Sequence, residues 1–214
     1  MTLRQAQGHP EQPRGMRVFG IDPGSERTGY GCVETDGRRH QLVACGAITA
    51  LAGDHFPHRL ARIHRELTTL LVKCRPDCVA IENLFHANNA RSALKLGHAR
   101  GVAMLAAIEA GCEIVEYTPA EVKRAVVGYG RAEKHQVQQM IKLLLGLEKA
   151  PKPFDASDAL AVAICHLHSR PVRSQADLKV GLYRNSRSPL EAEMKVGVKK
   201  RSRSWRHYRP PTAG

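Results

Sequence analysis

Three short apolar segments follow one another within the first 50 residues, and the short links between them constrain the fold more than any other feature. The segments are residues 16–21 (MRVFGI), 28–34 and 41–50. The first runs into the turn sequence DPG, and the second and third are joined by the turn-like TDGRRH. Links this short suit antiparallel neighbours, because a parallel crossover needs a dozen or more residues. The sequence therefore predicts an antiparallel three-stranded meander.

After the meander, helical and strand patterns alternate. Apolar residues at helical spacing predict the first helix over residues 58–74, and the buried strand CVAI follows at 78–81. The remaining predicted elements are helices at 88–110, 119–127, 133–147 and 155–168 and a strand at 113–117. This order predicts an α/β domain in which crossover strands extend the meander into a mixed sheet with helices on both faces.

The charge balance favours a polyanionic partner. Lys and Arg number 33 against 20 Asp and Glu, a formal net charge of +13. Residues 171–214 hold 11 Lys and Arg and 3 Asp and Glu, so this segment carries +8. Nucleic acid is the first candidate partner and an anionic membrane surface the second. We expect residues 1–15 and 171–214 to be disordered, the latter as a basic DNA-binding tail, and residues 16–170 to form one folded domain.

The sequence gives no sign of a membrane span or a disulfide framework. The longest apolar stretch, around residues 101–108, is too short to cross a bilayer, and the N-terminus lacks the apolar core of a secretory signal. Six cysteines occur without any C-x-x-C pair. We therefore expect reduced, buried thiols in a cytoplasmic protein.

Four carboxylates stand where a solvated loop would not place them. Asp22 follows the first strand, Glu82 follows CVAI, and Asp155 and Asp158 begin the last helix on one face. If the two strands are neighbours, Asp22 and Glu82 lie side by side, and the last helix can bring its acids to them. Simpler interpretations remain open for three of them: Asp22 as a turn residue, and Asp155 as a helix N-cap with Asp158 in its first turn.

Four acids in one apolar-walled pocket need a cation to stay ionised together. Ligands that are all oxygen suit Mg²⁺ or Mn²⁺. Two such ions about 4 Å apart would support hydrolysis of a phosphodiester.

Four stretches together resemble the RuvC family of bacterial Holliday-junction resolvases. They are FGIDPGSERTGYG (19–31), VAIENLFHANNARSALKLGHARGVAMLAAIEAG (79–111), EYTPAEVKRAVVGYGRAEKHQVQQMIKLLL (116–145) and DASDALAVAICHLH (155–168). The resemblance spans nearly all of residues 16–168. Family members generally begin close to the first strand and end soon after the last helix, so the two terminal segments depart from the pattern.

The resemblance implies a ribonuclease-H-like fold and a homodimeric endonuclease that nicks two strands symmetrically across a four-way DNA junction during recombination and repair. Asp22, Glu82, Asp155 and Asp158 would be its catalytic acids, binding two Mg²⁺ ions with Mn²⁺ as a substitute. RuvA and RuvB, the branch-migration proteins, would be partners, and the bacterial cytoplasm, at the nucleoid, would be the location. The alternatives are a non-catalytic junction-binding module and a general ribonuclease-H-like nuclease.

The resemblance also suggests residues that contact DNA. Phe85 matches an aromatic residue placed near unpaired bases at the junction centre, although a core position fits it equally well. Lys134 matches a basic residue close to the scissile phosphate, and a solvated surface lysine is the alternative. Lys123 and Arg124 are further candidates for phosphate contacts. The closing H-x-H, His166 and His168, cannot share one helix face, but either could lie near the acids.

Overall fold

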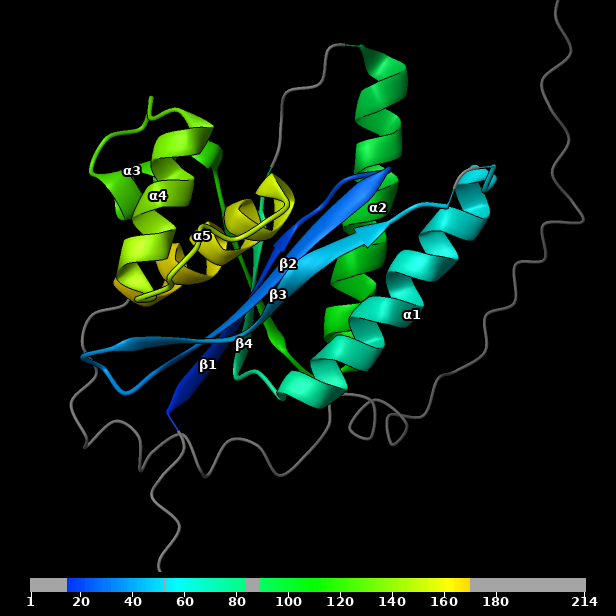
Figure 1. Cartoon of the computed structure of the whole chain (residues 1–214). Coiled ribbons are helices and arrows are strands. Elements are labelled where there is room, and N and C mark those ends of the chain that lie inside the picture. The colour runs from blue at the N-terminus through cyan, green and yellow to red at the C-terminus, as the bar shows by residue number, and fades with distance from the viewer. Residues whose placement is uncertain (1–14, 52, 84–88, 170–214) are drawn as a thin grey trace, which may run out of the picture. The chain divides into compact units, whose positions relative to one another are not determined.

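A five-stranded mixed sheet forms the centre of the part of the chain that the computed structural model describes, which is residues 15–51, 53–83 and 89–169 (Figure 1). The strands are β1 (Met16–Asp22), β2 (Arg27–Thr35), β3 (His40–Thr49), β4 (Cys78–Glu82) and β5 (Glu113–Tyr117). The helices are α1 (Phe56–Cys74), α2 (Ala90–Glu109), α3 (Pro119–Val127), α4 (Lys134–Leu144) and α5 (Phe154–Ser169). The strand order across the sheet is β3-β2-β1-β4-β5.

The predicted meander and crossover strands are confirmed. β1 pairs with β2, and β2 with β3, in antiparallel registers, whereas β4 pairs with β1, and β5 with β4, in parallel registers. Each predicted element is present in the predicted order. The ends differ by a few residues, for local reasons. α2 begins at Ala90 because the Asn89 side chain caps it, accepting the Ser92 backbone N–H at 2.9 Å. The last predicted turn of α4 is absent, and Gly146 has a left-handed φ of 60° there.

Other predictions fall outside the described residues. These are the disorder of residues 1–15, of which only Gly15 is described, the disorder of 171–214, and the placement of Phe85. They remain predictions.

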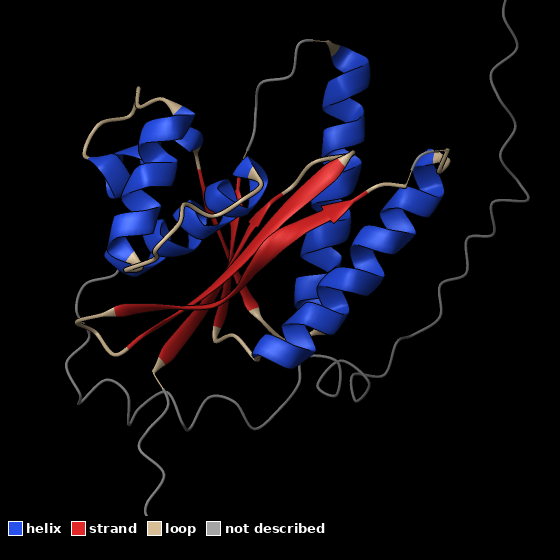
Figure 2. Cartoon of the chain, in the orientation of Figure 1, coloured by secondary structure: helices blue, strands red, loops and turns tan. Residues whose placement is uncertain are grey.

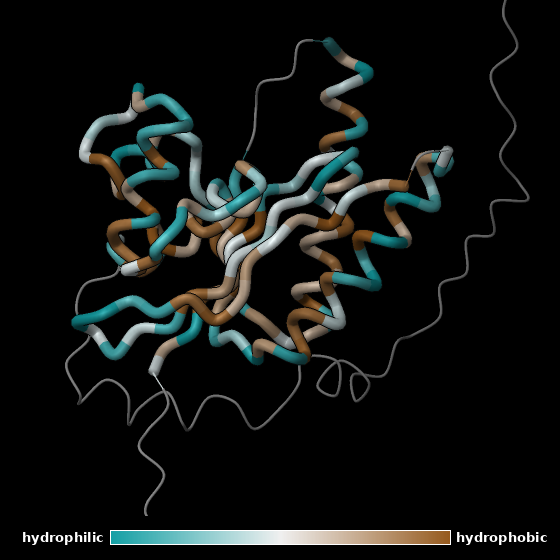
Figure 3. Tube along the Cα trace, in the orientation of Figure 1, coloured by the Kyte–Doolittle hydropathy of each residue, from teal (hydrophilic) through white to brown (hydrophobic). Residues whose placement is uncertain are grey.

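Helices cover both faces of the sheet (Figure 2). Along β1 the side chains alternate between the two faces, since Val18 packs in the layer that includes α5, α3 and α4, while Phe19 and Ile21 pack in the layer that includes α1 and α2. α1 is amphipathic. Hydrophobic and hydrophilic residues alternate along it at helical spacing (Figure 3), and its apolar face buries Ile63 and Leu67.

α5 lies directly on the strand backbones. A Cβ atom added to Gly20 would come within 1.9 Å of the Ala159 carbonyl oxygen, and one added to Gly31 would come within 2.6 Å of the Leu160 side chain. Gly20 and Gly31 are register partners on β1 and β2. Glycine at both positions therefore permits a helix-to-sheet approach that any side chain would block.

All six cysteines are free thiols, as expected. In the described ranges, no helix combines the length and the apolar character that crossing a membrane requires.

Candidate active site

Asp22 and Glu82 are neighbours at one edge of the sheet. Each is the last residue of its strand, and the parallel pairing of β1 with β4 places Ile21 opposite Ile81. The next residue of each strand, a carboxylate in both cases, therefore leaves the sheet at the same level. Asp22 also pairs with Gly29 of β2, so it belongs to the sheet rather than to a free turn.

α5 brings the other two acids to this edge. A Cβ on Gly29, the register partner of Asp22, would come within 2.0 Å of the Asp155 carbonyl oxygen. The first turn of α5 thus rests on the strand end that carries Asp22. Asp155 is the second residue of the helix rather than its cap, since α5 begins at Phe154.

A cleft of about 340 Å³ opens beside these residues. Asp22, Glu82 and Asp158 line it on the acidic side, and Lys123 and Lys134 supply positive charge. Pro119, Val122, Val137 and Ala161 form its apolar walls. We call this the acidic cleft. Asp155 is not among the lining residues, and its Oδ2 accepts a bond from Arg27 Nη1 at 3.3 Å.

Burial and mutual repulsion raise the pKa of both paired carboxyls. Burial raises the pKa of Asp22 well above its usual range, and the nearby Glu82 and Asp158 raise it further. Burial and the charge of Asp158 raise the pKa of Glu82 to about 7, although a hydrogen bond with Asp22 opposes the rise. At neutral pH the pair therefore favours a shared positive counter-charge.

Lys134 supplies part of that charge. It is the first residue of α4, and its Nζ donates to Asp158 Oδ2 at 2.9 Å. This bond to a carboxylate raises the pKa of Lys134, and Asp22 and Glu82 add to the rise. Lys134 is therefore an ion-pair partner of the acids rather than a lysine that only water contacts.

The donor set fits a hard divalent cation. Among the residues that the structure describes, no three His, Cys, Asp or Glu side chains are already arranged around one point to hold a metal ion. Lys134 and Arg27 instead occupy oxygen atoms of Asp158 and Asp155. Burial and the neighbouring acids raise the pKa of Asp22 and Glu82, so their ionised forms would be stabilised by further positive charge. An ion bound by oxygen atoms would supply it.

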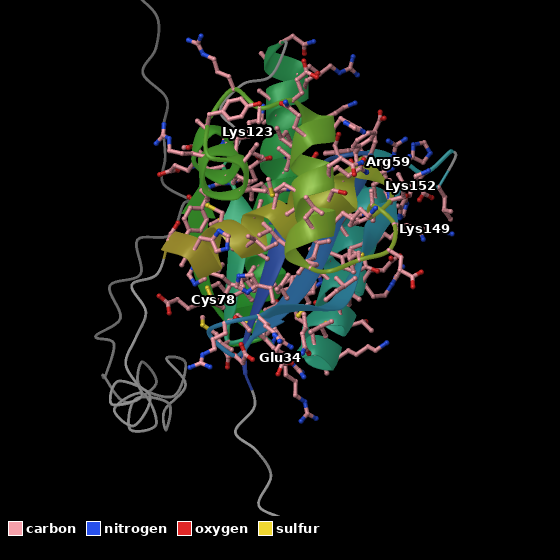
Figure 4. The ribbon with its side chains drawn as sticks, turned by 60° about the vertical axis from the view of Figure 1, so that its left-hand side comes forward. Glu34, Arg59, Cys78, Lys123, Lys149 and Lys152 are labelled. Carbon is pink, nitrogen blue, oxygen red and sulfur yellow. The ribbon has the colours of Figure 1, made fainter. Side chains whose placement is uncertain are left out.

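Of the other two predicted phosphate contacts, Lys123 and Arg124, only Lys123 lies in the acidic cleft. Lys123 is half-buried and lines the acidic cleft, whereas Arg124 is exposed on α3 and does not line it. Figure 4 shows Lys123 toward the end of the molecule opposite Glu34 and Cys78, in keeping with its place by the carboxyl end of β4.

The histidines of the H-x-H lie away from the acids. His166 is buried, and its Nδ1 lies 2.9 Å from the Tyr117 hydroxyl. His168 is exposed near the end of α5, about 15 Å along the helix axis from Asp158. The expectation that either could lie near the acids is wrong for His168, because Asp155 and Asp158 occupy the other end of the same helix.

Sequence reasoning overlooked Arg27. Arg27 lies within the stretch 19–31 that carries the family resemblance, and this position could have marked it as a candidate site residue. An arginine beside a turn, however, is ordinarily a solvated residue. Only the packing of α5 over β2 brings Asp155 within its reach.

Comparisons with known proteins identify the family of this chain. The family model described as crossover junction endodeoxyribonuclease RuvC matches residues 18–166. The protein of that name from Koribacter versatilis is 55% identical over 155 residues, covering 72% of this chain and 93% of that protein. The one from Pelobacter propionicus is 49% identical over 195 residues, covering 91% of this chain and all of that protein. The expectation that family members end soon after the last helix therefore does not hold for every relative.

A solved structure shows the same fold. Thermus thermophilus RuvC in complex with a Holliday junction substrate is 34% identical, with a TM-score of 0.65 over 72% of this chain and 93% of that one. The shared fold confirms the ribonuclease-H-like α/β class that the resemblance implied. On its sequence, its fold and its acidic cleft, this chain belongs to the RuvC family of crossover junction endodeoxyribonucleases.

Proposed function

We propose that this protein resolves four-way DNA junctions by paired, metal-dependent nicks during recombination and repair. The observation that carries the proposal is the acidic cleft, where carboxylates from β1, β4 and α5 meet two lysines. The T. thermophilus relative is seen bound to such a junction, which supports the same substrate here.

Each group in the cleft has a distinct task. Asp22, Glu82, Asp155 and Asp158 would hold two Mg²⁺ ions, with Mn²⁺ as a substitute. Ions held there would supply the Lewis-acid chemistry of phosphodiester hydrolysis, in which water is the nucleophile and the products carry a 5′ phosphate and a 3′ hydroxyl. Lys134 and Lys123 place two ammonium groups where a phosphate would enter and reduce the repulsion between that phosphate and the acids. The apolar walls, among them Val122 and Val137, limit the water around these charges.

Four residues make up the proposed DNA surface. Lys134 and Lys123 would contact the phosphate nearest the acids. Arg124, exposed on the same short helix as Lys123, would contact a phosphate outside the cleft. Phe85 would stack on unpaired bases at the junction centre.

Two symmetric nicks require two active sites, and α2 offers a surface for a second copy of the chain. Leu94, Leu105 and Ile108 are 64%, 51% and 61% exposed. They share one face of the helix with Gly97 and Gly101, where an added Cβ would meet nothing within 4 Å. An apolar face with small residues at its centre allows two copies of a helix to approach closely. We propose a homodimer built on this face.

The remaining proposals rest on the family and on charge. RuvA and RuvB are the proposed protein partners, and the bacterial cytoplasm at the nucleoid is the proposed location. Residues 171–214, with their net charge of +8, would add DNA affinity without sequence preference.

A nicking assay on a synthetic four-way junction with Mg²⁺ tests the central proposal. The Glu82→Gln variant should bind the junction and leave its strands intact. Glu113→Gln, which removes an exposed acid at the start of β5, is the matched control and should cut normally. Wild-type protein that binds but never cuts would indicate a junction-binding module, and preferential cutting of an RNA–DNA hybrid would indicate a general ribonuclease. If Glu82→Gln still cuts, the role of Glu82 is wrong.

A further inference from the structure

Two histidines face each other at the end of the molecule away from the acidic cleft. His40 is the first residue of β3, next to the β2–β3 turn, and His168 is near the end of α5. Their Nε2 atoms are 3.3 Å apart. The ring centroids are 5.3 Å apart and the ring planes are tilted by 44°, so the rings meet through their nitrogen edges instead of stacking.

The second nitrogen of each ring is held by a group that fixes its proton. His168 Nδ1 lies 3.0 Å from the Ala125 carbonyl oxygen, which can only accept, so Nδ1 carries the proton. His40 Nδ1 lies 3.1 Å from Thr35 Oγ1. The Thr35 hydroxyl already donates to the Arg39 carbonyl at 2.9 Å, so it accepts from His40 Nδ1–H.

Both Nε2 atoms of the neutral rings are therefore lone-pair acceptors that point at each other. Two acceptors at this distance repel unless a cation or a proton lies between them. The spacing suits a metal ion, because two nitrogens about 2.0–2.1 Å from a tetrahedral Zn²⁺ are about 3.3–3.4 Å apart. A metal-binding histidine also ordinarily donates its other N–H to a protein acceptor, as both rings do here.

The surroundings of His40 favour its neutral form, which is the form that binds metals. Burial lowers the pKa of His40, and the neighbouring His168 lowers it further, while Asp36 opposes the shift. Asp36 Oδ1 is engaged by the backbone N–H groups of Arg38 and Arg39, at 2.8 and 2.7 Å. His168 is exposed and His40 is half-buried, so an ion can enter from solvent.

We propose that His40 and His168 bind a Zn²⁺ ion, or a similar divalent ion with an affinity for imidazole, through their Nε2 atoms. In the described residues no third His, Cys, Asp or Glu joins them, so water completes the coordination. The ion ties the β2–β3 turn to the end of α5, and through Ala125 to α3. This site is separate from the acidic cleft in place and in chemistry, since its donors are nitrogen and those of the cleft are oxygen.

Titration of the full chain with ZnCl₂ in excess Mg²⁺, followed by calorimetry and thermal unfolding, tests the proposal. Wild-type protein should bind one more Zn²⁺ per chain than His40→Gln or His168→Gln, and only wild type should show the full rise in Tm. The double variant should lose no more than either single variant. His64→Gln is the control, because His64 pairs with Glu109 between α1 and α2 and should leave the extra site intact.

A cooperative thermal unfolding transition measured in EDTA establishes that each variant is folded before Zn²⁺ is added. Equal Zn²⁺ stoichiometry and equal Tm shifts in wild type, His40→Gln and His168→Gln would overturn the proposal and leave a shared proton as the occupant of the gap.

Discussion

Gly29 of β2 lies beneath the main chain of Asp155, so close that a Cβ atom at Gly29 would come within 2.0 Å of the Asp155 carbonyl oxygen. Gly29 is also the register partner of Asp22. One glycine thus joins the strand end that carries the first acid to the helix end that carries two others. The spacing of the acids depends on a position that has no side chain.

Gly29→Ala should therefore reduce nicking more than it reduces junction binding. The added methyl group pushes the first turn of α5 away from β1, which separates Asp155 and Asp158 from Asp22. We expect a loss of about 1–3 kcal/mol in the free energy of unfolding. Urea unfolding and single-turnover nicking measure the two effects. Gly130→Ala, whose methyl group would meet nothing closer than 3.4 Å, should change neither, and an equal effect of both variants would contradict this explanation.

Lys134→Ala should slow nicking by roughly 10–100-fold, as loss of a group bonded to a metal ligand commonly does. The substitution removes the ammonium group that donates to Asp158. In the wild-type protein the charge of this group lowers the pKa of Asp22 and Glu82. Junction affinity should fall less. Lys142→Ala, at the other end of α4, is the matched control and should cut at the wild-type rate. A wild-type rate in Lys134→Ala would remove this lysine from the site.

The metal-free protein should lose stability as the pH rises from about 4.5 to about 7. Glu82 has an ordinary pKa of 4.5 and a pKa of about 7 in the folded chain, so the folded state binds its proton more tightly than the unfolded state. That stabilisation is complete below pH 4.5 and disappears through pH 7. Glu82→Gln should therefore gain stability relative to wild type at pH 8 but not at pH 5, as measured by urea unfolding in EDTA. Parallel curves for the two proteins at all pH values would exclude this linkage.

Leu105→Glu should convert the proposed dimer to a monomer by placing a charge on the exposed apolar face of α2, one turn from Gly101. Val72→Glu on α1, where the side chain is 66% exposed, is the matched control and should leave the mass unchanged. Sedimentation equilibrium distinguishes the two. A dimer that persists in Leu105→Glu must use another face.

Deletion of residues 171–214 should weaken junction binding mainly at low salt. For every DNA phosphate that the shortened chain no longer neutralises, the slope of log K against log salt should become shallower by about 0.9. A full-length chain with the 11 tail lysines and arginines changed to glutamine separates charge from length and should behave like the deletion. Equal affinities of wild type and deletion at low salt would show that the tail does not contact the junction.

The element order could be predicted from the sequence, because it depends on local patterns. The pairing of Asp22 with Glu82 could be expected only on the condition that their strands are neighbours in the sheet. Each acid is the last residue of its strand, and the parallel register of β1 with β4 meets that condition. The acids of α5 were harder to place. Their position depends on Gly20, Gly29 and Gly31, and a sequence does not reveal that three glycines lie under one helix.

Pairings between distant elements could not be predicted. Lys134 with Asp158 and Arg27 with Asp155 join residues 24 and 128 positions apart. A long, flexible side chain reveals its partner only after the helices have packed. His40 and His168 are likewise brought together only by the fold. The family resemblance had suggested the acids, not His40, as neighbours of His168.

The contact of α5 with Gly20 and Gly31 has a consequence for variation in this protein. Main-chain atoms of the helix rest on Gly20, and the Leu160 side chain rests on Gly31, so no strand side chain acts as a spacer at either position. Mutations that alter the volume of valines, leucines and isoleucines elsewhere in the interior can thus accumulate while the height of the helix above the strands stays the same. Substitutions among the other apolar core residues should therefore be tolerated more readily than a replacement of Gly20 or Gly31.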